Sequence, residues 1–315
     1  MSATTRAATA ALGYPPAAMP VDPAWDPEED LPTAETEPTR WQRAWRFTRP
    51  SRASLAVGLA AIGLIAVFAI FGPWLTPYDP NTPDPSAITA PPSSQHWLGT
   101  DQYGRDVLSR IIAAARLDLT VAVSITALAL LAGSLIGAVS GFLGGRVDDV
   151  VMRFIDVLLA FPAFILALGI TAMLGNETRF VVVAVAIAYT PYFTRLVRGE
   201  MLTLRESEFA QAALCAGNRR PRILLYHLLP NALPPALAQA TLTLGWGILD
   251  VAGLSFLGVG ITPPTPEWGV LVADGAQYVN SGQWWISVFP GIAILIAVLG
   301  FNLVGDWLRD NLWRR

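Results

Sequence analysis

The sequence predicts an all-α membrane protein with six transmembrane helices. Hydrophobic residues make up 53% of the chain and charged residues only 14%, and the mean hydropathy is +0.46. A soluble domain of this length is much less apolar. Because a helix needs about 20 apolar residues to cross a bilayer, we expect six spans, the shorter ones lengthened by their flanks. The uncharged runs cover residues 55–75, 119–143, 157–174, 180–194, 232–249 and 284–304.

Arginine clusters indicate on which side of the membrane the loops lie. All 21 basic residues are arginine, and they gather before the first span, in the stretch 195–222 and in residues 309–315. Loops rich in basic residues stay in the cytoplasm. With six spans, this distribution predicts that both chain termini are cytoplasmic.

The chain divides into three parts. Residues 1–48 are rich in alanine, proline, threonine and acids and lack a periodic apolar pattern, so we expect a disordered cytoplasmic tail or, alternatively, a segment that binds a partner. No apolar stretch of signal-peptide length follows the first methionine. Residues 49–115 hold the first span and a proline-rich extracytoplasmic loop, and residues 116–315 hold the other five helices.

The extracytoplasmic loop ends in polar residues and then a helical pattern. From Asp106 onward, apolar residues at helical spacing predict a segment that lies along the membrane face before the chain turns inward. His96 beside Asp101 raises the alternative of a metal site, but no further ligands stand at a usable spacing. We therefore expect no metal in this loop.

Two features within the spans predict helix geometry. Pro191 lies inside the fourth run, where it removes a helix hydrogen bond and predicts a kink. In the second span, Gly133, Gly137 and Gly141 recur every four residues. Such a stripe of small residues predicts close packing against another helix.

Two acids lie in or near the membrane. Asp250 has apolar neighbours on both sides, and a charge at that depth is costly. We expect it either to line a path through the bundle or to act as a hydrogen-bonded structural acid at a helix or subunit interface. Asp156 stands one turn from Arg153, which predicts an intrahelical ion pair at the cytoplasmic surface.

The stretch 205–230, between the fourth and fifth spans, predicts a helix, a tight turn and a second helix. Gly217 favours the left-handed conformation that ends a helix, and Pro221 suits the first turn of the next one. A narrow apolar face is expected on the first helix, because small side chains recur at helical spacing. This face consists of Phe209, Ala212, Ala213 and Ala216.

A resemblance to a known family rests on this stretch. The pattern runs Gln211-Ala212-Ala213, then Gly217, then Leu229-Pro230. It resembles the coupling loop of permeases in ATP-binding-cassette (ABC) importers, although Gln211 stands where that family usually has glutamate. Motifs at residues 98–110, 254–269 and 301–310 are similar to the second, C-type permease subunit of the dipeptide, oligopeptide and nickel importers.

This resemblance implies the ABC type I importer permease fold and a place in a larger assembly. A second permease subunit would complete a heterodimer in the bacterial plasma membrane, two ATPase subunits would bind ATP and Mg²⁺, and an extracytoplasmic binding protein would deliver the substrate. It implies no cofactor bound by this chain and no nucleic acid. The residues implied to couple to an ATPase are Glu208, Gln211, Ala212, Ala213, Gly217, Leu229 and Pro230.

Other function classes fit the sequence less well. A phosphate-binding loop of the Gly-x-x-x-x-Gly-Lys type needs a lysine, and the chain has none, so we expect no ATPase site of its own. A membrane enzyme is disfavoured because His96 and His227, the two histidines, lie outside the spans. A membrane anchor or sensor would not need the docking loop. Peptides are the expected cargo, with nickel chelates, glutathione or another small solute as alternatives.

Overall fold

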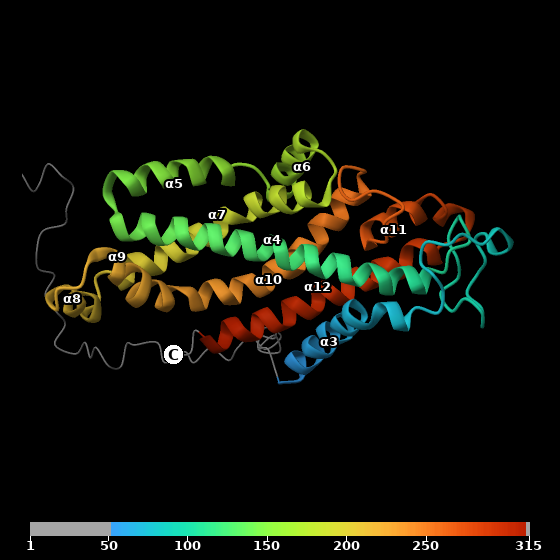
Figure 1. The fold of residues 1–315 in the computed structure, drawn as a ribbon, viewed down its shortest axis with the longest axis horizontal. Coiled ribbons are helices and arrows are strands. Elements are labelled where there is room, and N and C mark those ends of the chain that lie inside the picture. Colours follow the sequence, from blue (N-terminus) through green and yellow to red (C-terminus); the bar gives the residue numbers. More distant parts are fainter. Residues whose placement is uncertain (1–51, 313–315) are drawn as a thin grey trace, which may run out of the picture. The chain divides into compact units, whose positions relative to one another are not determined.

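The computed structural model describes residues 52–312, and these contain five helices long and apolar enough to span a membrane. They lie alongside one another in a bundle (Figure 1). Within the described residues there is no strand, apart from a single bridge between Thr100 and Asp106. The all-α membrane fold is therefore confirmed. The five are α3 (Arg52–Leu75), α4 (Val107–Leu143), α7 (Thr178–Leu204), α10 (Leu229–Phe256) and α12 (Trp285–Leu312).

Shorter helices connect these spans. Two of them, α5 (Gly145–Leu159) and α6 (Ala163–Leu174), follow α4. The helices α8 (Glu208–Cys215) and α9 (Arg220–Arg222) follow α7, and α11 (Trp268–Ala276) precedes α12. The predicted tail of residues 1–48 lies outside the described residues.

The third predicted span, the run 157–174, is divided between two helices. Helices α5 and α6 meet at a break of only three residues and are bent by 88°. Pro162 stands at this break and lacks the N–H that would continue the hydrogen-bond ladder. It also disfavours helical geometry at the residue before it. The run 157–174 is therefore divided between two helices, and the count reaches the predicted six spans if the bent pair crosses as one.

The second span also begins earlier than expected. Residues 107–115 were expected to lie along the membrane face, but α4 continues through them without interruption to Leu143. The Asp106 carboxylate caps the helix by accepting the Ser109 N–H at 2.8 Å. No glycine or proline occurs between Val107 and Ala132, so nothing in the sequence breaks the helix there. The predicted turn inward was wrong.

Helix α4 packs closely against α7 along the predicted glycine stripe. A Cβ atom added at Gly137 would lie 2.4 Å from the Thr194 carbonyl oxygen, and one at Gly133 would lie 2.5 Å from the Phe193 Cβ. At Gly141 the nearest atom would be the Arg198 oxygen, at 2.9 Å. The prediction of close packing is confirmed, because only glycine fits between these two backbones. Helix α7 itself runs as one helix through Pro191.

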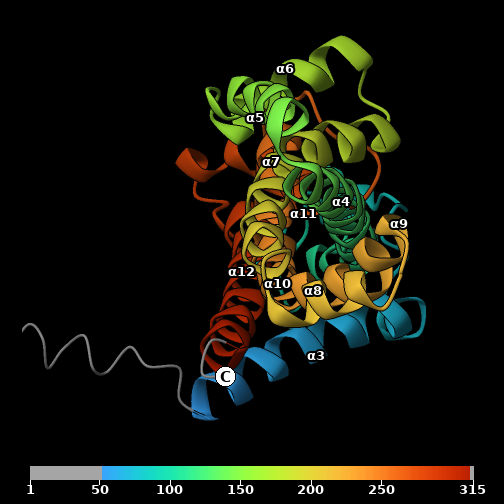
Figure 2. The same ribbon diagram turned by 90° about the vertical axis from the view of Figure 1, so that its left-hand side faces the viewer.

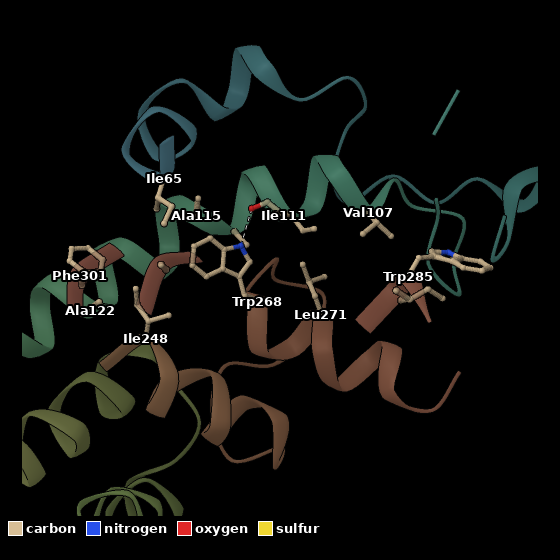
Figure 3. Close-up of a cluster of buried hydrophobic side chains, with 13 residues drawn as sticks. Ile65, Val107, Ile111, Ala115, Ala122, Ile248, Trp268, Leu271, Trp285 and Phe301 are labelled. Carbon is tan, nitrogen blue, oxygen red and sulfur yellow. Dashed lines mark hydrogen bonds between the residues drawn. The ribbon is translucent and has the colours of Figure 1, made fainter. Parts of the chain in front are cut away.

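A cluster of buried hydrophobic side chains joins α3, α4, α10, α11 and α12 (Figure 3). Trp268 is 1% exposed, and its indole Nε1–H donates to the Ile111 carbonyl oxygen at 3.0 Å. Ile65, Ile248 and Phe301 belong to the same cluster. Burying an aromatic ring whose N–H is hydrogen-bonded is strongly favourable. Trp268 therefore stabilises the packing of α11 against the spans.

Candidate functional site

The predicted helix and turn of the 205–230 stretch, which we call the coupling loop, lie at one end of the bundle (Figures 1 and 2). Helix α8 ends at Cys215, and Gly217, two residues later, has φ +79°, in the left-handed region. The Gly217 N–H donates to the Leu214 oxygen at 2.9 Å, and the Asn218 N–H donates to the Ala213 oxygen at 3.2 Å. This pair of bonds is a Schellman motif, which satisfies the last helix carbonyls. The predicted role of Gly217 is confirmed.

The apolar face of α8 is divided between the protein interior and the surface. Ala210 is 2% exposed and packs in a buried cluster with Ile223 and Leu228, and Ala213 is half-buried against the same cluster. The exposed apolar residues are Phe209, Ala212, Leu214, Cys215 and Ala216. The single face predicted from spacing was therefore wrong for Ala213, because the short helix needs one side to pack against the spans.

The remaining predicted coupling residues lie around this helix. Glu208 is exposed in the first turn of α8, where the helix dipole stabilises a negative charge. Gln211 is exposed, and its side-chain amide donates to the Glu206 oxygen at 3.2 Å. Leu229 and Pro230 belong to the first turn of α10. Since Arg220–Phe256 forms one candidate span, the second helix of the loop is the beginning of that span.

Polar bridges that the sequence did not predict connect the coupling loop to the neighbouring helices. Arg205, directly after α7, donates to the Gly141 oxygen near the end of α4 at 2.9 Å. Two turns earlier, Arg198 forms two 2.5 Å contacts with the Asp148 carboxylate of α5, which also accepts from the Ser140 hydroxyl. These bonds join the ends of α4, α5 and α7 beside α8.

A further bridge corrects the predicted partner of Asp156. Its carboxylate contacts Arg195 of α7 at 2.5 Å, rather than Arg153 of its own helix. Both side chains are about half exposed, so the bridge contributes little to stability. The spacing of these residues could have indicated ion pairs between the two helices. Asp148 and Asp156 are two turns apart on α5, and Arg195 and Arg198 are one turn apart on α7.

Asp250 is buried in α10 and has a hydrogen-bond donor on the neighbouring span. The Tyr189 hydroxyl of α7 donates to its Oδ2 atom at 2.8 Å, and the Asp250 residue is 9% exposed. A buried polar group needs such a partner. This contact joins α7 to α10 and agrees with a structural acid, while a role in the substrate path stays a prediction.

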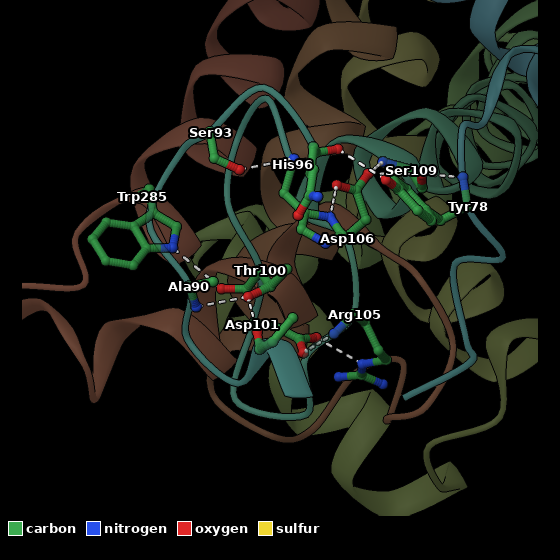
Figure 4. Close-up of polar contacts among 12 residues, drawn as sticks. Tyr78, Ala90, Ser93, His96, Thr100, Asp101, Arg105, Asp106, Ser109 and Trp285 are labelled. Atoms are coloured by element: carbon green, nitrogen blue, oxygen red, sulfur yellow. Dashed lines mark hydrogen bonds and ion pairs between the residues drawn. The ribbon is translucent and has the colours of Figure 1, made fainter. Parts of the chain in front are cut away.

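At the opposite end of the bundle, the motif between His96 and Ser109 forms a compact loop (Figure 4). The Asp101 carboxylate accepts the backbone N–H of Tyr103 and of Arg105, and Arg105 Nε at 2.6 Å. His96 contacts Asp106 at 3.0 Å rather than Asp101. These bonds hold the loop together, and in residues 52–312 there is no group of three metal-ligating side chains.

A pair of buried carboxyl groups anchors α11, and the sequence analysis missed it. Glu267 caps α11 by accepting the N–H groups of Gly269 and Val270 at 2.9 and 2.8 Å, and Asp118 accepts the N–H of Trp268 at 3.2 Å. Burial raises the pKa of the Glu267 carboxyl, although the two backbone bonds act in the opposite direction. The overlooked signal was an acid, Asp118, directly before an uncharged run.

Two family models match successive parts of the chain. Residues 108–315 match the model of the binding-protein-dependent transport system inner membrane component. Residues 39–92 match the N-terminal transmembrane domain of oligopeptide transport permease C.

Curated relatives cover nearly the whole chain. The dipeptide transport system permease protein DppC of Alkalihalophilus pseudofirmus is 40% identical over 293 residues, which is 92% of this chain and 96% of the relative. The nickel transport system permease protein NikC of Escherichia coli is 41% identical over 266 residues, or 84% and 96% of the two chains. The probable D,D-dipeptide transport system permease protein DdpC of Escherichia coli is 40% identical over 285 residues, or 88% and 95%. The chain is thus a multi-pass inner membrane protein and belongs to the family of binding-protein-dependent transport system inner membrane components, in its peptide and nickel branch.

Proposed function

We propose that this chain forms half of the translocation path of an ABC importer for di- and oligopeptides. The dipeptide and D,D-dipeptide permeases among its relatives support a peptide cargo. A second permease subunit would form the other half, an extracytoplasmic binding protein would deliver the peptide, and two ATPase subunits would bind ATP and Mg²⁺. Both termini and the coupling loop would be cytoplasmic, as the arginine distribution indicates.

The observation that carries this proposal is the exposed side of α8. Ala212 and Ala216 leave room for the backbone of a partner, and Phe209, 44% exposed, offers an apolar ring one turn before Ala212. The Schellman turn at Gly217 fixes how this side is presented. With an arginine of the ATPase, Gln211 would form a neutral hydrogen bond. This bond is about 1 kcal/mol weaker than the charge-assisted bond that a glutamate would form there. Binding of an ATPase here rests on shape more than on charge.

The bridges at the base of the loop suggest how a movement of α8 reaches the spans. Arg205 ties the loop to the end of α4, and the Arg198–Asp148 pair ties α7 to α5. When ATP closes the ATPase dimer, a shift of α8 would move these helix ends together. The bundle would then exchange inward-facing and outward-facing shapes around the path.

The test replaces Ala212 by Arg, because this residue is exposed and its long substitute blocks a close contact without disturbing the interior. Asn311→Arg, exposed near the end of α12, is the matched control. In a purified importer complex, we expect Ala212→Arg to insert normally but to lose the ATPase subunit and peptide uptake, while Asn311→Arg retains both. An Ala212→Arg complex that keeps a fully active ATPase would exclude the coupling role of α8.

Nickel chelates are a second candidate cargo, because the nickel permease NikC is as similar to this chain as the dipeptide permeases are. Mass spectrometry of the ligand carried by the copurified binding protein separates the two. A bound peptide supports the main proposal, and a bound nickel chelate replaces it.

A further inference from the structure

A cavity of about 500 Å³ lies between α3, α4 and the loop that follows α3, far along the chain from the coupling loop. Its volume is in the range of small-ligand sites. The lining residues that matter here are Phe68, Gly72, Tyr78, Asp79, Ile112 and Arg116.

The wall that the loop contributes is held in place by hydrogen bonds to α4. The Tyr78 N–H donates to the Ser109 hydroxyl oxygen at 3.2 Å. Arg110, whose side chain is fully buried, donates from Nη1 to the Pro80 carbonyl oxygen at 2.9 Å. The loop is therefore fixed across the first turns of α4, and the cavity is a built feature of the fold.

Aromatic side chains locate this cavity at the boundary between lipid headgroups and hydrocarbon. Trp74, 79% exposed, and Tyr78, 43% exposed, stand at the end of α3, and exposed Trp and Tyr gather at that boundary in membrane proteins. Phe68 lies six residues before Trp74, which places it about 9 Å deeper along the helix. The cavity thus extends from the headgroup level into the hydrocarbon.

Arg116 is an exposed cation on the deep side of this cavity. Gly72 packs against Ile112, since a Cβ there would be 3.5 Å from Ile112 Cγ2. Arg116, one turn further along α4, is about 6 Å deeper than that contact. Among residues 52–312 we find no acidic partner for its guanidinium. An arginine at this depth extends toward the headgroups and needs an anion.

We propose that this cavity binds one phospholipid with an ammonium headgroup. The guanidinium of Arg116 binds the phosphate through paired N–H donors, and the acyl chain lies against Phe68 and Ile112. Asp79 provides the partner for the ammonium group: its Oδ1 accepts from Asn81 and Thr82, and an ionised carboxylate keeps further acceptor sites.

Native mass spectrometry of the purified full-length chain tests this proposal. The protein is equilibrated with equal amounts of phosphatidylethanolamine, phosphatidylglycerol and diacylglycerol of the same chain length. We expect about one phosphatidylethanolamine per chain and no retained diacylglycerol. Loss of a charge-assisted bond lowers affinity by roughly tenfold or more, so Arg116→Gln should lose the lipid, and Arg116→Lys should retain part of it.

Two further variants separate the cavity from the charge. Ala113→Phe fills the cavity but keeps Arg116, and it should also lose the lipid. Asp79→Asn should abolish the preference for phosphatidylethanolamine over phosphatidylglycerol without lowering total retention. Arg179→Gln, at another exposed arginine outside this cavity, is the control and should behave as the wild type.

Three results would overturn the proposal. One is equal lipid retention in the wild type, Arg116→Gln and Ala113→Phe. Another is retention of diacylglycerol as strongly as of phospholipid, because the phosphate would then play no part. The third comes from the chain copurified with the second permease subunit: loss of that subunit from Arg116→Gln at unchanged lipid content would assign the cavity to a protein contact.

Discussion

Replacing Gly137 by alanine should destabilise the bundle by separating α4 from α7. The new Cβ atom would lie 2.4 Å from the Thr194 carbonyl oxygen and 3.0 Å from the Arg198 backbone nitrogen. Both neighbours are backbone atoms of a long helix, so neither moves aside cheaply. Overpacking of this kind costs about 1–3 kcal/mol.

The matched control is Gly199→Ala on α7, where nothing lies within 4 Å of the added Cβ. Both glycines are helical, so both variants gain the same helix propensity. The difference between them therefore isolates the clash between the helices.

Thermal unfolding of the purified protein in one detergent measures this difference. We expect Gly199→Ala to unfold at or slightly above the wild-type midpoint and Gly137→Ala to unfold clearly below it. Because the seam ends beside Arg198 and Arg205, ATPase coupling should weaken in Gly137→Ala as well. Equal midpoints for the two variants would refute the close approach of α4 and α7.

Four further predictions follow from individual residues. Gly217→Val should cost about 1–2 kcal/mol because φ is +79° there, and it should reduce ATPase binding in a pull-down without affecting membrane insertion; unchanged binding would contradict the turn. Asp250→Asn should keep the unfolding midpoint near that of the wild type. Asp250→Leu should lower the free energy of unfolding by about 1–3 kcal/mol, and with it the midpoint, because the Tyr189 hydroxyl loses its acceptor. Equal midpoints for the two variants would argue against a structural acid. Because burial raises the folded-state pKa of Glu267 above 4.5, its protonated form favours folding, so wild-type stability should fall as pH rises from about 4.5 through that raised pKa. Glu267→Gln should show a weaker dependence of the unfolding midpoint on pH than the wild type. In intact cells a membrane-impermeant maleimide should label a cysteine placed at Ser93 but not the exposed Cys215, and the reverse pattern would invert the topology.

Several features of the fold were predictable because they depend on composition and local spacing. Uncharged runs of spanning length identified the long helices without any knowledge of their neighbours. Gly217 ended α8 as expected, since a left-handed residue is a local requirement that glycine meets at little cost. The stripe of Gly133, Gly137 and Gly141 predicted a close helix contact from a four-residue period alone.

The choice of partner for each side chain was decided by the tertiary structure. Asp156 binds Arg195 across helices, and the rotation of α5 against α7 that brings them together is not encoded in the spacing of either helix. Ala213 faces the interior, because α8 packs one side against the spans that surround it. The pairing of Asp118 with the α11 cap joins residues 150 positions apart.

The sequence by itself determined that this chain is an all-α membrane protein, where most of its helices run and which loop has the coupling pattern, because these follow from hydrophobicity, period and backbone preference. Only the tertiary structure decided that α5 and α6 meet at a bend of 88°, which side of α8 is left free and which buried polar groups meet. Those outcomes depend on how helices rotate and slide when they pack, and contacts between distant residues set that arrangement.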